Sequence, residues 1–398
     1  MENSKGKVSF LSLQLSLTFL LIIASPYISQ RINNIVKLCM EMMLIATIIT
    51  GSKLKRKAVE ICFPTIIFLC LTCFSSFRWS GLSSRFMNTF VTGTAYVLFF
   101  YIIYSSCKIK QERVNAIIKN NLIFYIVILD FFVLVTRGKG LGGLSEAVYL
   151  LGNKFMVSYF HMALLALIIG DYKKKSNVTI FKIILLSIYS VMICRIADTT
   201  TGVLGIIFML FFWFVANQKP NIYKLLSNPI VIISFFVGSN AIFLLSNIII
   251  NNSVISNFLL EHSHTDTLLS GRLPMYKIVM NAISTNWVWG YGINYDIVQA
   301  TLSFGNAQNG LLKMILDYGV VGTVAFIMII FFAFKKSRGS CQGRVNVGII
   351  SFIYGMLFCS LVEINLDALF FLFLALAAGN QKIMQGEMAG ANIIAYKI

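Results

Sequence analysis

Long apolar runs, separated by short charged or turn-rich stretches, repeat along the whole chain. A helix needs about 20 mostly apolar residues to cross the hydrocarbon core of a bilayer, and most of the runs approach this length. We predict twelve membrane spans, at residues 8–24, 35–50, 59–76, 88–107, 121–137, 157–171, 180–197, 201–216, 229–249, 311–334, 345–362 and 366–379. The second run contains Lys37 and Glu41, and the last is short. The pattern therefore predicts an all-α, polytopic transmembrane helical bundle.

The composition agrees with this pattern. Of the 398 residues, 58% are hydrophobic and 12% are charged, and the mean hydropathy is +0.81. Soluble domains of this length are not so apolar. The N-terminus resembles a signal peptide, but no small-x-small cleavage site follows its apolar run, so we interpret it as a retained first span. The eight cysteines lie nearly all inside apolar runs and predict neither a disulfide framework nor a zinc site.

Charge predicts the orientation in the membrane. About two thirds of the 33 Lys and Arg residues lie on the side that holds both termini and alternate connections such as SKLKRK and YKKKSN. Acidic residues favour the other side. By the positive-inside rule, the basic side is cytoplasmic and both termini lie there. The net charge of +18 thus reflects topology and anionic lipid, and it does not indicate nucleic-acid binding.

One long connection divides the chain into three parts. We predict spans 1–9 in residues 1–249, a large external loop in residues 250–309, and spans 10–12 with a short cytoplasmic tail in residues 310–398. Within the loop, LPMYKIVMNAI can form a helix that lies flat on the membrane, with one apolar side made of Met275, Ile278, Val279 and Ala282. Trp287 and Trp289 are of a residue type that is enriched at the level of the lipid headgroups. Gly290 and Gly292 permit a tight turn or a close approach to a ligand, although a purely structural lid could use the same residues.

The outer side carries six Arg residues, against the general trend of charge: Arg31, Arg78, Arg85, Arg137, Arg195 and Arg272. Arginine binds phosphate or carboxylate through a planar, bidentate fork. Snorkelling to lipid phosphates is the simpler explanation for Arg31 and Arg85. Arg272 lies in a Ser-Gly-Arg turn, and Arg195 lies within the outer end of a span. We therefore predict that Arg272 and Arg195 bind an anion, with Arg137 and Arg78 as weaker candidates.

Other ionisable residues give less direct signals. Glu261 to Asp266 contains two His residues, and in an extended chain His262, His264 and Asp266 share a face. A metal site is conceivable there, but a general base or a sugar contact is the preferred interpretation. Asp130 stands alone near mid-membrane, and His161 lies in the next span. We interpret Asp130 as structural or as lining a lipid-facing cavity.

The order and spacing of the loop motifs resemble the O-antigen ligase and repeat-unit polymerase superfamily. The residues that carry the resemblance are Ser270-Gly271-Arg272, Trp289, Gly290-Tyr291-Gly292, Gln308-Asn309 and Gly319 to Gly322. A large late outer loop among 10 to 14 spans is also typical of that family, roughly as predicted here. The family frequently has His before the Asn, where this chain has Gln308. Because that His is tied to catalysis in the ligases, its replacement favours a polymerase of the Wzy type.

The resemblance implies glycosyl transfer without metal or cofactor on the outer face of a bacterial cytoplasmic membrane. The donor would be a glycan on undecaprenyl pyrophosphate, and the acceptor a lipid-linked repeat unit of O-antigen, lipopolysaccharide or capsule. Arg272 and Arg195 would stabilise the departing pyrophosphate. The base could be His264, Asp266, His262 or Glu261. The expected substrate-binding residues are Arg137, Arg78, Gln308, Asn309, Trp289 and Tyr291. A chain-length regulator and a flippase are expected partners.

Two alternatives stay open. A ligase of the same superfamily would join a finished glycan to another acceptor. A lipid-linked oligosaccharide flippase or other transporter would also be a twelve-span protein, but it predicts paired ionisable residues at mid-membrane and two similar halves. The two halves of this chain differ, since only the second contains the long loop.

Overall fold

The computed structural model describes residues 2–22, 29–51, 56–141, 147–170, 177–250, 272–293, 295, 297–302, 307–335 and 345–380. Nearly all of these residues are helical, which confirms the all-α prediction. The helices are α1 Glu2–Ile22, α2 Gln30–Gly51, α3 Arg56–Ser80, α4 Ser84–Val135, α5 Lys154–Gly170, α6 Asn177–Ile196, α7 Thr200–Gln218, α8 Pro220–Leu226, α9 Pro229–Ile250, α11 Arg272–Thr285, α12 Ile297–Leu302, α13 Gly310–Phe334, α14 Val345–Cys359 and α15 Ala368–Asn380. Two short antiparallel strands, β1 Val148–Tyr149 and β2 Gly152–Asn153, follow α4.

Each predicted span corresponds to an apolar helical segment. Seven segments among the described residues are long and apolar enough to cross a membrane. An eighth is the bent pair formed by α8 and most of α9, whose axes differ by 62°. The other predicted spans correspond to the shorter apolar segments Leu11–Ile22, Lys154–Gly170, Val347–Cys359 and Ala368–Gly379. Which of these segments cross the membrane, and hence the count of twelve, stays a prediction.

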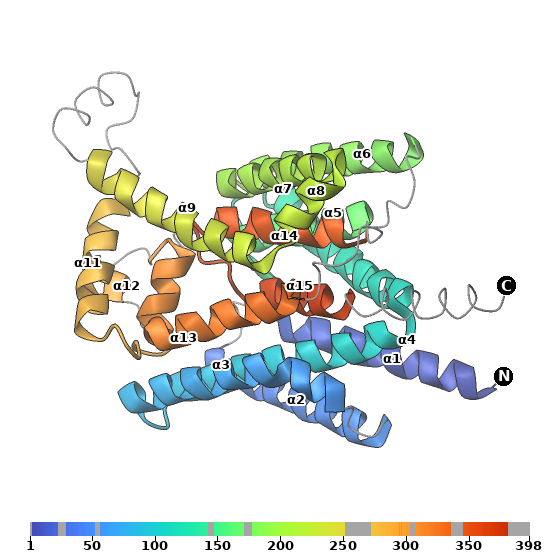
Figure 1. The fold of residues 1–398 in the computed structure, drawn as a ribbon, viewed down its shortest axis with the longest axis horizontal. Coiled ribbons are helices and arrows are strands. Elements are labelled where there is room, and N and C mark those ends of the chain that lie inside the picture. Colours follow the sequence, from blue (N-terminus) through green and yellow to red (C-terminus); the bar gives the residue numbers. More distant parts are fainter. Residues whose placement is uncertain are drawn as a thin grey trace.

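One predicted loop is wrong. The charge of residues 108–120 predicts a loop between two spans, but these residues are helical and belong to the 52-residue helix α4. Their place on the cytoplasmic side stays a prediction. This stretch has no Gly or Pro, and its Lys, Gln, Glu, Arg and Ala residues have high helix propensity. The two spans predicted on either side are still present as the apolar segments Ser84–Cys107 and Gln111–Val135. Figure 1 shows α4 changing direction between them.

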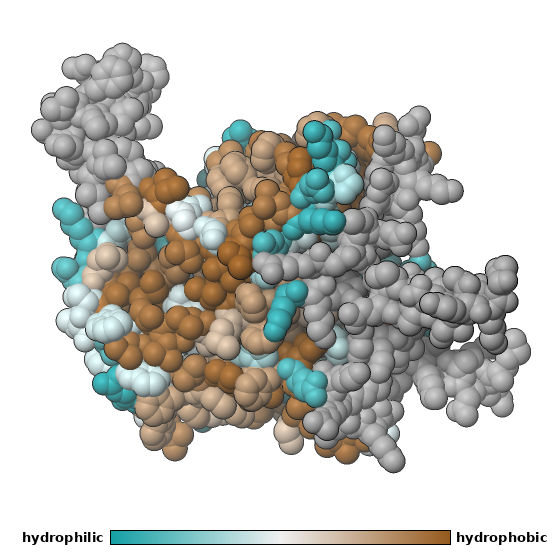
Figure 2. All heavy atoms as spheres, viewed as in Figure 1, coloured by the Kyte–Doolittle hydropathy of each residue, from teal (hydrophilic) through white to brown (hydrophobic). Residues whose placement is uncertain are grey.

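The bundle has two clearly different ends. In Figure 1, α1 begins and α15 ends at one side of the molecule, whereas α11 and α12 lie at the other. The helix α11 runs across the ends of α9 and α13 instead of along the bundle. In Figure 2, apolar side chains cover much of the face that α9 and α13 present. The helices α11 and α12 of the predicted outer loop thus lie at the end of the bundle opposite the start of α1.

The centre of the bundle is formed largely by its shorter helices. Side chains of α5 are buried almost continuously from Val157 to Leu167. Those of α15 are buried from Leu369 to Ala378. A helix that is apolar on every face is expected to be enclosed by other helices instead of facing water. The longer helices α2, α3 and α6 expose apolar side chains such as Ile49, Phe63 and Phe181, as expected of helices in contact with lipid.

The orientation can be tested with reporter fusions in cells. We expect reporters placed after Lys174 and Ser340 to be cytoplasmic, because those connections carry the clustered positive charge. A reporter at Ser263 is expected to be external. Paired phosphatase and fluorescent-protein fusions would measure this. A cytoplasmic reporter at Ser263 would contradict both the orientation and any chemistry assigned to the outer loop.

Candidate functional site

The helix α13 is interrupted at Gly319, where φ is 66° and ψ is −176°. In an unbroken helix, the N–H groups of residues 320 and 321 would bond to the carbonyls of residues 316 and 317. At the break, all four groups bond to the outer loop instead. The bonds are Tyr291 N–H to Leu316 at 2.9 Å, Gly292 N–H to Asp317 at 2.7 Å, Val320 N–H to Trp287 at 2.8 Å and Val321 N–H to Val288 at 3.2 Å. The segment from Trp287 to Gly292 therefore satisfies backbone groups that the lipid could not.

The glycines of this junction permit close approach of backbone to backbone. A Cβ atom on Gly290 would lie 2.5 Å from the amide nitrogen of Gly319. A Cβ atom on Gly319 would lie 2.1 Å from the carbonyl oxygen of Val288. Gly292 has φ +82 and meets Ser76 of α3 in the same way. The close approach predicted for Gly290 and Gly292 is thus made to α13 and α3 of the same chain.

The apolar side predicted for the loop helix is confirmed in α11. Met275, Val279 and Ala282 are buried in a small core with residues of α12 and α13. Tyr291 belongs to this core, and its hydroxyl donates to the carbonyl of Ala282 at 2.8 Å. Trp289 packs edge-on against Phe74 of α3, with ring centroids 4.8 Å apart. Tyr291 and Trp289, both predicted to bind substrate, therefore hold the loop to the bundle.

Arg85 contacts a group of aromatic rings near the end of α3 and the start of α4. Tyr291 and Tyr295 stack with centroids 4.2 Å apart, and Trp79 stands edge-on to both rings. The guanidinium carbon of Arg85 lies 5.9 Å from the Tyr295 centroid, within cation–π range. Burial raises the pKa of the Tyr295 phenol, Tyr291 adds to the shift, and Arg85 opposes it. Arg85 thus has a specific contact with the loop that simple snorkelling does not predict.

A buried Lys–Asp pair lies beside this group of rings. The Lys313 ammonium donates to Asp317 at 2.8 Å, and the carbonyl of Tyr295 lies 3.4 Å from the same nitrogen. Both side chains are largely buried, one turn apart on α13. The sequence contained a signal for this pair, since two opposite charges at i and i+4 interrupt an otherwise apolar span. It was not recognised.

Gln308 and Asn309 form the start of α13. Gln308 has the unusual φ of 41°. The fully buried Asn309 side chain donates to Asn240 and to the carbonyl of Leu361, each at 2.9 Å, and accepts from the Leu312 N–H at 2.9 Å. The amide group therefore joins α13 to α9 and to the turn after α14. The Asn309 side chain therefore makes its hydrogen bonds mainly to other groups of the protein.

We expect Asn309→Ala to destabilise the fold by about 3 kcal/mol or more, because it removes a helix cap and leaves buried polar groups unpaired. Thermal unfolding of the purified protein would measure this. Asn217→Ala is the matched control, since the Asn217 amide is exposed and donates only to Trp213 of its own helix. A variant that keeps its stability but loses activity would instead support the substrate-binding role predicted for Asn309.

A second group of polar residues lies at the ends of α4, α5 and α6 that are predicted to face outward. A Cβ atom on Gly138 would lie 1.8 Å from the carbonyl of Ile196, so the turn after α4 touches the end of α6. Arg137 precedes Gly138 and Arg195 precedes Ile196, and both arginines are exposed. Lys154, at the start of α5, lies 3.5 Å from Asp198. The fold thus brings together two predicted anion-binding residues and Lys154, a cation that the sequence did not single out.

Arg195 continues a stripe of exposed apolar residues on α6, which includes Phe181, Ile184, Ile188 and Met192. A stripe with this helical spacing is expected to face lipid. Arg195 lies at the end of this stripe, at a level that we predict to be that of the lipid headgroups. In the part of the chain that the structure describes, no carboxylate lies within ion-pair distance of Arg137 or Arg195.

Other predicted site residues lie apart from this group or outside the described residues. Arg78 is exposed near the end of α3, which packs chiefly against α4 and α13. Arg272 is the first residue of α11, and its side chain is not among those described. His264 and Asp266, with Glu261 and His262, also lie outside the described residues.

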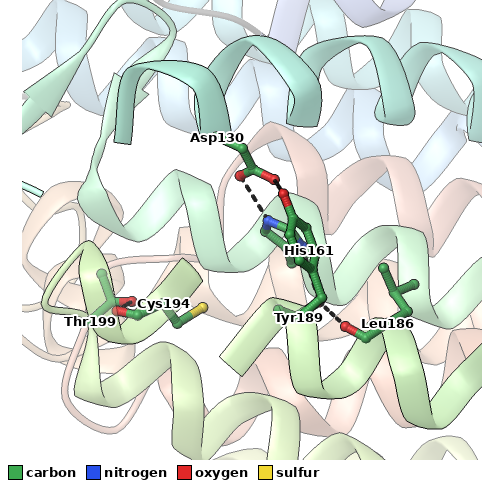
Figure 3. A network of polar contacts seen from close by, with 7 residues as sticks. Asp130, His161, Leu186, Tyr189, Cys194 and Thr199 are labelled. Carbon is green, nitrogen blue, oxygen red and sulfur yellow. Dashed lines mark hydrogen bonds and ion pairs between the residues drawn. The ribbon is translucent and has the colours of Figure 1, made fainter. Parts of the chain in front are cut away.

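Asp130 is not isolated, and this corrects the interpretation from the sequence. Its carboxylate accepts from the Tyr189 hydroxyl at 2.6 Å and lies 3.0 Å from Nε2 of His161 (Figure 3). The other ring nitrogen of His161 lies 3.0 Å from the Ser190 hydroxyl. Both Asp130 and His161 stand out in the sequence as ionisable residues within apolar runs, but only the packing of α4 against α5 and α6 shows that they meet.

Comparison with known families gives one match. Residues 184–327 match the family model described as O-antigen ligase. The matched region begins in α6 and ends in α13, so it contains Arg195, Arg272 and the break at Gly319. No curated protein and no solved structure matches the chain. The family match supports the superfamily resemblance and a part in assembling surface polysaccharide, in a multi-pass membrane protein.

Proposed function

We propose that this protein is a glycosyltransferase that polymerises undecaprenyl-pyrophosphate-linked oligosaccharide repeat units on the outer face of the bacterial cytoplasmic membrane. The observation that carries the proposal is the group Arg137, Lys154 and Arg195, at the outer ends of three adjacent helices and partly within the region that matches the ligase family. The exposed Arg residues have no carboxylate partner among the described residues. They are therefore available to an anion at headgroup depth.

The chemistry fits these residues. Transfer of the glycan releases undecaprenyl pyrophosphate, so negative charge develops on the leaving group as the glycosidic bond breaks. Preorganised cations that face this charge lower the barrier, and arginine supplies them without a metal. A lipid-linked donor would approach from the bilayer, and Arg195 lies on the face of α6 expected to contact lipid. Arg272 would complete the anion site from the outer loop, and a group in residues 261–266 could take the acceptor proton.

The surface polysaccharide of a deletion strain tests this function. We expect the strain to carry single repeat units on its lipid core and no ladder of longer chains. A plasmid copy of the chain should restore the ladder, and a copy with Arg195→Ala should restore little of it. Polysaccharide gels would measure the ladder, with membrane levels of each variant checked by immunoblot. Unchanged ladders in the deletion strain would contradict the proposal.

Two other functions give different results in the same experiment. The ligase, favoured by the description of the matching family, predicts no repeats on the core at all. A transporter is favoured by one observation, the buried pair of Asp130 and His161, because coupled transporters use paired ionisable groups within the membrane. A flippase predicts no repeats on the core, with lipid-linked units trapped inside the cell. We prefer the polymerase because Gln308 stands where the ligases have their His.

A further inference from the structure

A buried polar network joins three consecutive helices of the bundle. Asp130 comes from α4, His161 from α5, and Tyr189 and Ser190 from α6 (Figure 3). His161 and Ser190 are fully buried and Asp130 is 4% exposed, whereas the Tyr189 ring faces outward with its hydroxyl directed at Asp130. A network this complete fixes the rotation and the height of each helix relative to the other two.

Proton accounting indicates that the network holds one shared proton. The Ser190 hydroxyl donates to the carbonyl of Leu186 at 2.7 Å, so its oxygen is free to accept from Nδ1–H of His161. Tyr189 donates to one oxygen of Asp130. One proton then remains between Nε2 of His161 and the other oxygen of Asp130, which are 3.0 Å apart.

The order Ser190, His161, Asp130 resembles a nucleophile, base and acid, but the network cannot serve in that way. Ser190 is fully buried, and its hydroxyl is bonded to its own helix. The network lies five to seven residues from the ends of its helices that are predicted to face outward, which is about 8 to 10 Å. A general base must come within hydrogen-bond reach of the proton that it removes. A substrate at headgroup depth would not meet this requirement.

The same helices carry the three outer cations. Arg137 follows Asp130 by seven residues, Lys154 precedes His161 by seven, and Arg195 follows Tyr189 by six, each about two helical turns toward the outer end. At that level, the contact of Gly138 with Ile196 and the pair of Lys154 with Asp198 join the same helices again. The Lys154–Asp198 pair contributes little by itself, because Asp198 is exposed to solvent. The buried network is therefore the stronger of the two connections.

We propose that the network of Asp130, His161 and Tyr189 is a set of positioning residues that fixes Arg137, Lys154 and Arg195 as one anion-binding group. This inference rests on the proposed function, since it supplies the reason why the three cations must stay in register. Misplacing a charge-stabilising group by about 1 Å is enough to reduce a rate about 100-fold. The network would provide that precision without contacting the substrate.

The test combines hydrogen exchange with the polysaccharide assay, using the full chain in nanodiscs and in cells. Asp130→Leu breaks both contacts of the carboxylate, and Tyr189→Phe removes one hydroxyl while keeping the ring. We expect both to increase amide exchange at residues 193–199 and 137–141, and Asp130→Leu to reduce polymer about 10- to 100-fold. Asp130→Asn should restore most activity, because its amide nitrogen can donate to Nε2 of His161 and its amide oxygen can accept from the Tyr189 hydroxyl.

Leu129→Ala is the matched control. Leu129 is equally buried on the same helix but is apolar, so its loss weakens packing without touching the network. We expect this variant to lower thermal stability with little change in exchange at residues 193–199. Unchanged exchange in Tyr189→Phe and Asp130→Leu would overturn the proposal. Loss of activity in Asp130→Asn with wild-type exchange would also overturn it, and would indicate that Asp130 carries protons itself.

Failure of the proposed function would look different. If the deletion strain keeps its ladder, the polymerase assignment fails, while the exchange data still decide whether the network holds the three helix ends. If exchange rises in Asp130→Leu while the ladder stays normal, the network fixes the helices but the three cations do not need that register. The positioning proposal would then be wrong.

Discussion

Arg272→Ala is expected to abolish polymer. The residue begins α11, a helix held to the bundle by the buried side chains of Met275 and Val279. An Arg at this position is therefore carried by an anchored element. The first N–H groups of a helix also favour an anion, so the backbone and the guanidinium would act on the same charge. Removal of one group that stabilises developing charge commonly reduces kcat about 100- to 1000-fold.

Arg272→Lys should leave little of the activity, because Lys is a point charge without the bidentate fork. Arg31→Lys is the control. Arg31 is exposed at the start of α2, where snorkelling to headgroups requires only positive charge. Arg85 is unsuitable as a control, since its contact with Tyr295 depends on a planar guanidinium. Ladder length, compared at equal membrane levels, is the measurement. A full ladder from Arg272→Ala would move the anion site to Arg195 and Arg137 alone.

Gly319→Ala is expected to open the junction between α13 and the outer loop. Its φ of +66 with extended ψ belongs almost solely to glycine, and such strain costs about 1–3 kcal/mol. The new methyl group would also meet the backbone carbonyl of Val288, which cannot move without breaking the four hydrogen bonds at the interruption. We expect a destabilisation of about 4 kcal/mol or more, with loss of polymer.

Gly238→Ala separates this effect from a general intolerance of larger residues. Gly238 lies in α9 with open space where its Cβ atom would be, and Ala favours helix by about 1 kcal/mol. Its thermal stability should be unchanged or slightly higher, while Gly319→Ala should unfold at a clearly lower temperature. Equal stability of the two variants would show that the interruption of α13 is not required by the fold.

Several features follow from the sequence alone because they depend on local composition. Apolar runs of span length predict the helices, since a backbone in lipid must satisfy its own hydrogen bonds. The helical spacing of Met275, Val279 and Ala282 predicts the buried side of α11, because this spacing can be read from a short stretch of sequence. The same kind of reasoning wrongly predicts a loop at residues 108–120. Their charge favours a loop between spans, but their residue types favour helix.

The candidate site depended on tertiary contacts between distant residues. The sequence presents Gly290, Gly292 and Gly319 as separate flexible points, but only their packing shows that they satisfy one interrupted helix. Asp130 looked isolated because its partners are 31 and 59 residues away along the chain. Lys154 lies near Arg137 and Arg195 only because the start of α5 packs beside the ends of α4 and α6. Local chemistry therefore determined the helices and the candidate charges, whereas the bundle decided which groups meet, because side chains distant in sequence interact only after the helices pack.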